Sequence, residues 1–108
     1  AKAAEARALN PKIRVQVRPD NAEQLKSMLA LFPERPPEII EVPAGFVPEL
    51  APLAHAAGAR VFTNGWGVDI QQIALGGMEQ GYVDMFGQGL DILQTEVPAA
   101  VRLALTGP

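Results

Sequence analysis

The sequence contains no cysteine, a single histidine (His55) and no long apolar run. The absence of cysteine excludes a disulfide scaffold and a zinc site built on thiolates, and it leaves the cellular compartment open. A membrane-spanning helix needs about 18 or more apolar residues in a row, so the sequence predicts no membrane span. Positive charge is also scarce, because 9 Lys and Arg stand against 12 Asp and Glu and give a net charge of −3. This balance predicts neither nucleic acid nor an anionic membrane surface as a partner.

Apolar residues, by contrast, are abundant enough for one folded domain. The 108 residues are 48% hydrophobic, which is ordinary for a globular protein and excludes wholesale disorder. We therefore treat 1–108 as one domain at most. The first five residues, AKAAE, include neither an initiator Met nor an apolar signal region, and they look like the middle of a helix. We expect the chain to be part of a longer protein.

Hydrophobic periodicity predicts short strands that alternate with helices. Ile13, Val15 and Val17 alternate with polar residues, a pattern typical of a strand. Strands are predicted at 12–18, 38–42, 60–64 and 91–96. Helices are predicted at 1–9, 22–32, 46–58, 82–88 and 98–106, and the glycine-rich stretch 65–81 is interpreted as a mobile lid or a disordered loop. Strands separated by helix-length spacers run parallel, which predicts an α/β fold of four parallel βα units.

The two faces of these strands differ in polarity. The polar face is predicted to carry Arg14, Gln16, Arg18, Glu41, Asn64, Gln94 and Glu96. Strands of an open parallel sheet normally read as continuous apolar runs, because helices cover both faces. A polar face is expected instead inside a (β/α)8 barrel of the TIM type, near its mouth. Four strands make half of such a barrel, so the rest would come from upstream sequence or from a second copy of this chain; a small open sheet is the alternative.

Two stretches carry a family resemblance. Residues 89–98 (GLDILQTEVP) join a glycine, an acidic residue, an apolar strand, Thr-Glu and a proline that leads into an amphipathic helix. This stretch resembles the C-terminal signature of the glycerophosphodiester phosphodiesterase family. Residues 59–66 (ARVFTNGW) look like the seventh strand of that family's barrel, and 13–19 and 37–42 are similar to its fifth and sixth strands. The resemblance covers nearly the whole chain, as the C-terminal half of a TIM-type barrel.

The resemblance implies hydrolysis of a small phosphodiester with a divalent metal, Ca²⁺ or Mg²⁺, in the intact barrel. In that family the two catalytic histidines and the Glu and Asp metal ligands lie in the first half of the barrel. His55 falls inside a predicted helix and matches neither histidine. We therefore assign no catalytic residue and no metal ligand to this chain, and we expect it to be inactive and to bind no metal alone. Its expected partner is the missing N-terminal half-barrel or a second copy.

The candidate substrate-binding residues are Arg18, Asn64, Trp66, Thr95 and Glu96, with Glu41 as a further candidate. A guanidinium group matches a phosphate bidentately, and Arg18 lies at the carboxyl end of its strand, where barrel active sites are found. The alternative is an interior ion pair of Arg18 with Glu41 or Glu96. Asn64 and Trp66 either contact the polar and apolar parts of a substrate or form a turn and pack in the core.

Three functions are thus compatible with the sequence. The first is the substrate-facing wall of a phosphodiesterase barrel. The second is a non-catalytic half-barrel that homodimerises or binds a small phosphate ester. The third is an open-sheet binding domain with its ligand at the carboxyl ends of the strands, and the order of the strands would separate it from the first two.

Overall fold

The computed structural model describes residues 2–107, so Ala1, which we expected in the first helix, lies outside the described residues. Within this range the predicted α/β architecture is confirmed: one sheet of four parallel strands is combined with six α-helices. The strands are β1 (Gln16–Val17), β2 (Ile39–Glu41), β3 (Arg60–Asn64) and β4 (Ile92–Gln94). The helices are α1 (Lys2–Leu9), α2 (Ala22–Ala30), α3 (Val47–Ala56), α4 (Trp66–Leu75), α5 (Glu79–Gly87) and α6 (Pro98–Thr106), and a short 3₁₀-helix, η1 (Ala44–Phe46), precedes α3.

The strands lie in the sheet in the order of the sequence, β1-β2-β3-β4, and every neighbouring pair is parallel. The register places Ile39 between Gln16 and Arg60. A doubly wound sheet reverses its strand order at a switch point, whereas a barrel adds its strands one after another. The sequential order is therefore compatible with half of a barrel.

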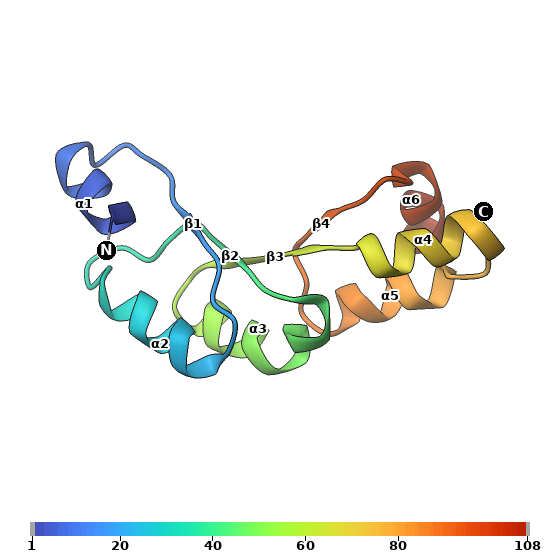
Figure 1. The fold of residues 1–108 in the computed structure, drawn as a ribbon, viewed down its shortest axis with the longest axis horizontal. Coiled ribbons are helices and arrows are strands. Elements are labelled where there is room, and N and C mark those ends of the chain that lie inside the picture. Colours follow the sequence, from blue (N-terminus) through green and yellow to red (C-terminus); the bar gives the residue numbers. More distant parts are fainter. Residues whose placement is uncertain (1, 108) are drawn as a thin grey trace.

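Helices cover only one side of this sheet. α2, α3 and α5 lie on the same side, and within the described residues no helix lies over the middle of the other side (Figure 1). The core forms between the sheet and this helical layer. Its fully buried members include Ile40 and Val61 from the strands, Leu25 from α2 and Leu50 from α3.

Local signals explain most of the helix boundaries. α2 begins after Asn21, whose side chain accepts a hydrogen bond of 2.8 Å from the backbone of Gln24, as an N-cap residue does. α3 contains Pro52 in its interior, a position that usually disrupts a helix. The amide that Pro52 lacks would bond to the carbonyl of Pro48, in the first turn of the helix, and both proline rings are exposed. The proline therefore leaves the buried side of α3 intact.

The interpretation of 65–81 as a disordered loop is wrong, because α4 occupies most of this stretch, while the mobile lid stays a prediction. Three of its glycines, Gly65, Gly76 and Gly77, flank the ends of the helix. A Cβ on Gly65 would lie 2.9 Å from Leu93 Cδ1 and 3.3 Å from the backbone oxygen of Gln94, so a larger residue here would require Leu93 to shift. Gly76 and Gly77 both have positive φ, and they end α4 in a turn that leads to α5.

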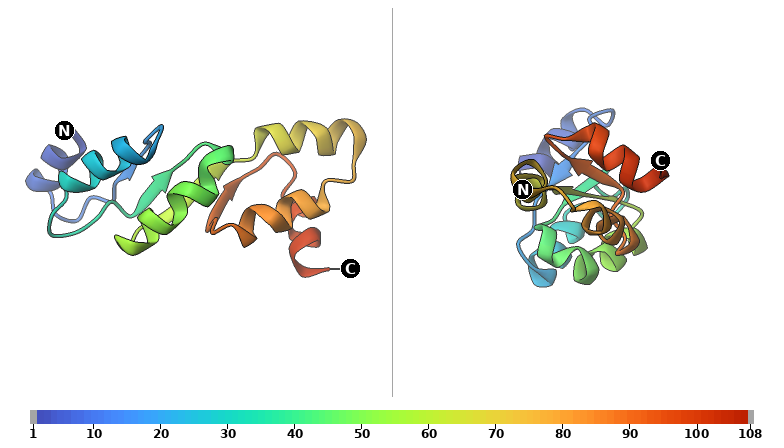
Figure 2. Two further views of the ribbon diagram at one scale, coloured as in Figure 1. Left: turned by 90° about the horizontal axis from the view of Figure 1, so that it is seen from below. Right: turned by 90° about the vertical axis from the view of Figure 1, so that its right-hand side faces the viewer.

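The molecule is elongated, with extents of 46 × 25 × 21 Å and a radius of gyration of 15.4 Å (Figure 2). A compact domain of this length has a radius of gyration of about 13 Å. The difference arises because α1 lies at one end of the long axis and α4, α5 and α6 lie towards the other, so the elements do not enclose a centre (Figure 1). Within residues 2–107, no helix is both long enough and apolar enough to cross a bilayer.

Candidate functional site

The side of the sheet without helices, here called the uncovered face, carries the polar residues that the alternation predicted. In β1 and its flanks, Arg14, Gln16 and Arg18 are exposed while Val15 is buried. Register and alternation place the following residues on this face: Arg14, Gln16, Arg18, Ile39, Glu41, Arg60, Phe62, Asn64, Ile92 and Gln94. Four of them, Ile39, Arg60, Phe62 and Ile92, were not assigned from the sequence, so the face is mixed rather than uniformly polar.

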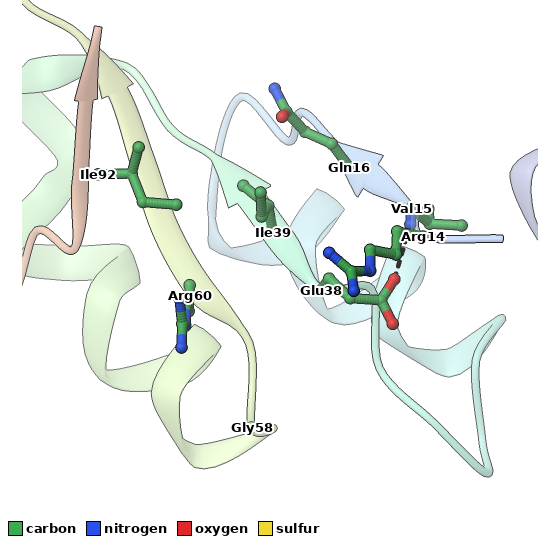
Figure 3. A pocket seen from close by; sticks show the side chains of 8 residues that line it. All are labelled: Arg14, Val15, Gln16, Glu38, Ile39, Gly58, Arg60 and Ile92. Carbon is green, nitrogen blue, oxygen red and sulfur yellow. Dashed lines mark hydrogen bonds between the residues drawn. The ribbon is translucent and has the colours of Figure 1, made fainter. Parts of the chain in front are cut away.

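A hollow of about 680 Å³ opens on this face, towards the amino ends of the strands. Figure 3 shows the residues that line it: Arg14, Val15, Gln16, Glu38, Ile39, Gly58, Arg60 and Ile92. Arg14 comes from the β1 side and Arg60 from β3, with Ile39 of β2 between them. The hollow thus combines an apolar floor with two guanidinium groups.

The candidate substrate-binding residues gather at the opposite, carboxyl edge of the sheet. Arg18 follows β1, Glu41 and Asn64 are the last residues of β2 and β3, and Thr95 and Glu96 follow β4. Parallel strands end at the same edge, which explains why the candidates come together there.

Arg18 and Glu41 form the ion pair considered from the sequence, but in this chain the pair lies at the surface and not in an interior. The Nε of Arg18 lies 3.5 Å from Glu41 Oε2, and the side-chain amide of Gln16 donates to Glu41 Oε1 at 2.9 Å. The Arg18 side chain is still 68% exposed, whereas that of Glu41 is 23% exposed. Glu41 therefore orients Arg18 without enclosing it, and the guanidinium remains accessible to an anion.

Asn64 and Trp66 form the corner between β3 and α4. The side-chain oxygen of Asn64 accepts a hydrogen bond of 2.9 Å from the backbone of Trp66, so Asn64 does form the turn considered for it. The Trp66 side chain is 57% exposed and is not packed in the core. With Ile70 and Ile73 it forms an exposed apolar stripe along α4.

Thr95 and Glu96 are held in place by Asp69, a residue that the sequence analysis did not single out. Asp69 Oδ1 accepts from the hydroxyls of Tyr82 (2.6 Å) and Thr95 (2.8 Å), and Oδ2 accepts from the backbone of Glu96 (2.7 Å). The carboxylate is 1% exposed. Asp69 thereby connects α4, α5 and the end of β4, while the Glu96 side chain stays exposed.

The three hydrogen-bond donors around Asp69 favour the ionised form of its carboxylate. Burial raises the pKa of Asp69, but the hydrogen bonds from Tyr82, Glu96 and Thr95 outweigh it and bring the pKa below its usual value. Burial and the neighbouring Asp69 carboxylate raise the pKa of Tyr82 far above its usual value. At neutral pH the pair is an ionised aspartate bound by a neutral tyrosine.

Two further clusters lie at the amino edge of the sheet. Glu38 accepts hydrogen bonds from Arg7 and from the backbone of Val15, and it forms an ion pair with Arg35. Burial raises the pKa of Glu38, but these contacts outweigh it and bring the pKa below its usual value. His55, half-exposed on α3 as its sequence position suggested, lies with Nε2 2.7 Å from Asp91 Oδ2. Burial likewise raises the pKa of Asp91, and its bonds to Val61 and His55 lower it overall.

The described residues do not fit a bound metal. Within 2–107 no three His, Cys, Asp or Glu side chains converge in a way that would hold an ion. At the carboxyl edge Glu41 is paired with Arg18 and Asp69 is saturated by its three donors. A divalent metal at this edge would need ligands from outside this chain.

Comparison of the chain with protein-family models, with curated proteins and with solved structures yields no match.

Proposed function

We propose that this chain is the C-terminal half of a barrel like that of the glycerophosphodiester phosphodiesterases, and that it supplies the substrate-facing wall. The observation that carries the proposal is the uncovered face of a parallel, sequentially ordered sheet whose other face packs against helices. In a closed barrel such a face lines the interior and the helices form the outer ring.

The open edges of the sheet support the same proposal. β1 and β4 each have one strand neighbour among the described residues, so each leaves one backbone edge unpaired. Unpaired edges are a liability that folded proteins usually cover or pair. Four more parallel strands would pair both edges and enclose the uncovered face, and they would account for the elongated shape of the chain taken alone.

At the carboxyl edge, the residues of this chain would bind and orient the substrate. Arg18, positioned by Glu41, would donate to the phosphate oxygens, and the exposed ring of Trp66 would contact the alcohol part of the diester. Asp69 would keep Thr95 and Glu96 in place on the wall. The acid, the base and the metal ligands would come from the other half of the barrel, where the metal would activate the attacking water.

The test is an assay of glycerophosphodiester hydrolysis with Mg²⁺ or Ca²⁺, on the 108-residue chain and on the same chain joined to its other half. We expect turnover only in the joined protein. There Arg18→Ala should lower kcat/KM by ~10–100-fold, the loss of a charged hydrogen bond to phosphate. Arg102→Ala on the exposed side of α6 is the matched control and should have no effect. Metal-dependent turnover by the isolated chain, or equal effects of the two substitutions, would contradict the proposal.

A further inference from the structure

The charge of the uncovered face is opposite in sign to that of the whole molecule. The face carries three arginines, Arg14, Arg18 and Arg60, against two carboxylates, Glu41 and Glu96, which follows β4, whereas the chain as a whole has a net charge of −3. The excess of positive charge is thus concentrated on the one surface that the chain's own helices leave open.

Two of these arginines have no ion-pair partner within the described part of the chain. Arg18 is paired with Glu41, but neither Arg14 nor Arg60 lies within 4.0 Å of a carboxylate oxygen among residues 2–107. Both line the hollow, and in the isolated chain both are solvated.

The carboxylates nearest the hollow are already engaged. Glu38 lines it but binds Arg7 and Arg35, so its charge is balanced there. Asp91 offsets part of the charge of Arg60, but it forms no ion pair with Arg60, and its Oδ2 is bound by His55 and by the backbone of Val61. The charge of Arg14 and the remaining charge of Arg60 would be compensated by whatever encloses the face.

A second copy of this chain cannot provide that compensation. Two copies facing each other would enclose four such arginines, Arg14 and Arg60 from each, in a lumen where water no longer screens them. Like charges brought together in this way select against a partner, and complementary charges select for one.

We infer that the partner of the uncovered face is a non-identical set of four parallel strands whose inner face carries carboxylates opposite Arg14 and Arg60. This inference rests on the proposed half-barrel and decides between its two candidate partners. The partner's strands pair with β1 and β4 at the two edges, and its carboxylates neutralise the amino-edge half of the lumen.

The test uses a variant of the chain whose uncovered face carries carboxylates, as the inferred partner's inner face does. Arg14→Glu together with Arg60→Glu reverses the sign of the charge on the uncovered face without touching the core, since both side chains are exposed. The matched control is Lys26→Glu with Arg102→Glu, which makes the same change in net charge on the exposed sides of α2 and α6. Sedimentation equilibrium at low salt measures association of each protein alone and of each variant mixed with the wild-type chain.

We expect the wild-type chain mixed with the Arg14/Arg60 variant to associate at least about 10-fold more tightly than either protein with itself, and the advantage to shrink at high salt. The control mixture should show no such advantage. Wild-type self-association as tight as that of the mixture would identify a second copy as the partner and overturn the inference. A mixture no tighter than the control mixture would also overturn it, because charge would then not select the partner.

Circular dichroism first confirms that the variants are folded. If the double variant is not folded, Arg60→Glu alone replaces it in the experiment, with Arg102→Glu alone as the control. This experiment measures association and does not depend on hydrolysis. If it overturns the inference about the partner, the proposed function is still tested separately by the hydrolysis assay on the joined protein. Conversely, an inactive joined protein leaves the choice of partner to be decided by association.

Discussion

The two faces of one short sheet differ in whether helices cover them. On the covered face Ile40, Val61 and Thr63 are fully buried, and the hydroxyl of Thr63 is satisfied by the carbonyl of Val42 at 2.6 Å. On the uncovered face the neighbouring positions Ile39, Arg60 and Phe62 have no helix above them within the described residues. The covered face belongs to the hydrophobic core of the chain. The uncovered face has the mixture of arginine, amide and apolar groups expected of an interior wall that something else completes.

The largest expected contrast comes from two adjacent residues of β2 that point to opposite faces. Ile40→Ala removes a fully buried side chain from the core and should lower the free energy of unfolding by about 2–5 kcal/mol. Ile39→Ala, one residue earlier, removes a partly exposed side chain from the hollow and should cost about 1 kcal/mol or less. Urea unfolding measures both. Equal losses would mean that the two faces contribute alike to the isolated fold.

The second contrast compares the buried anchor Asp69 with an exposed aspartate. Asp69→Asn replaces a carboxylate that accepts three hydrogen bonds by an amide whose NH₂ would face donors, and we expect a loss of about 2–3 kcal/mol in the free energy of unfolding. Asp84→Asn is the control, because Asp84 is exposed on α5 and, among residues 2–107, its carboxylate accepts only from the side chain of Gln80. A loss no greater than that of the control would show that Asp69 does not hold the carboxyl edge together.

Acid should weaken the fold through the same anchor. The pKa of Asp69, Glu38 and Asp91 is lowered in the folded state, so the unfolded chain binds protons more readily. The stability that they contribute is present above the unfolded pKa, about 4, and is lost as the pH falls through the lower folded pKa. The melting temperature of the wild-type chain should therefore drop between about pH 5 and pH 2, and that of Asp69→Asn should drop less. Parallel curves for the two proteins would contradict this assignment.

The smallest effect on stability is expected on the uncovered face. Arg18→Ala breaks an ion pair whose arginine is largely solvated, so the free energy of unfolding should change by about 1 kcal/mol or less. Thermal melting of the isolated chain checks this. A larger loss would give Arg18 a structural role and weaken its assignment to the substrate.

Alternation and spacing were sufficient to predict the existence of the four strands and most polar residues of the uncovered face, but not its apolar residues. The helix at 98–106 and the strand at 60–64 match the structure residue for residue, and the other predicted strands are longer than the observed ones. Strands this short are defined by pairing with neighbours, which no local pattern encodes. The sequential strand order also depends on contacts distant in the sequence.

The site was predicted in part. The gathering of Arg18, Glu41, Asn64 and Thr95 at one edge follows from parallel strands. Asp69 was missed because four glycines in 65–77 concealed a helix, although Trp66, Ile70 and Ile73 repeat at helical spacing. The contribution of Arg60 to the uncovered face could have been predicted, because Arg60 lies four residues before Asn64 in the same strand and alternation places both on one face.

The most direct test asks whether the uncovered face becomes enclosed, and the absence of cysteine from the chain makes it simple. Ile39→Cys places a thiol in the hollow, and Glu23→Cys places one on the exposed side of α2 as a control. Both should react rapidly with a maleimide in the isolated chain. In the chain joined to its other half, labelling at position 39 should slow by several orders of magnitude and labelling at position 23 should not change. Equal rates at position 39 in both proteins would show that this face stays open to solvent, and would contradict the barrel.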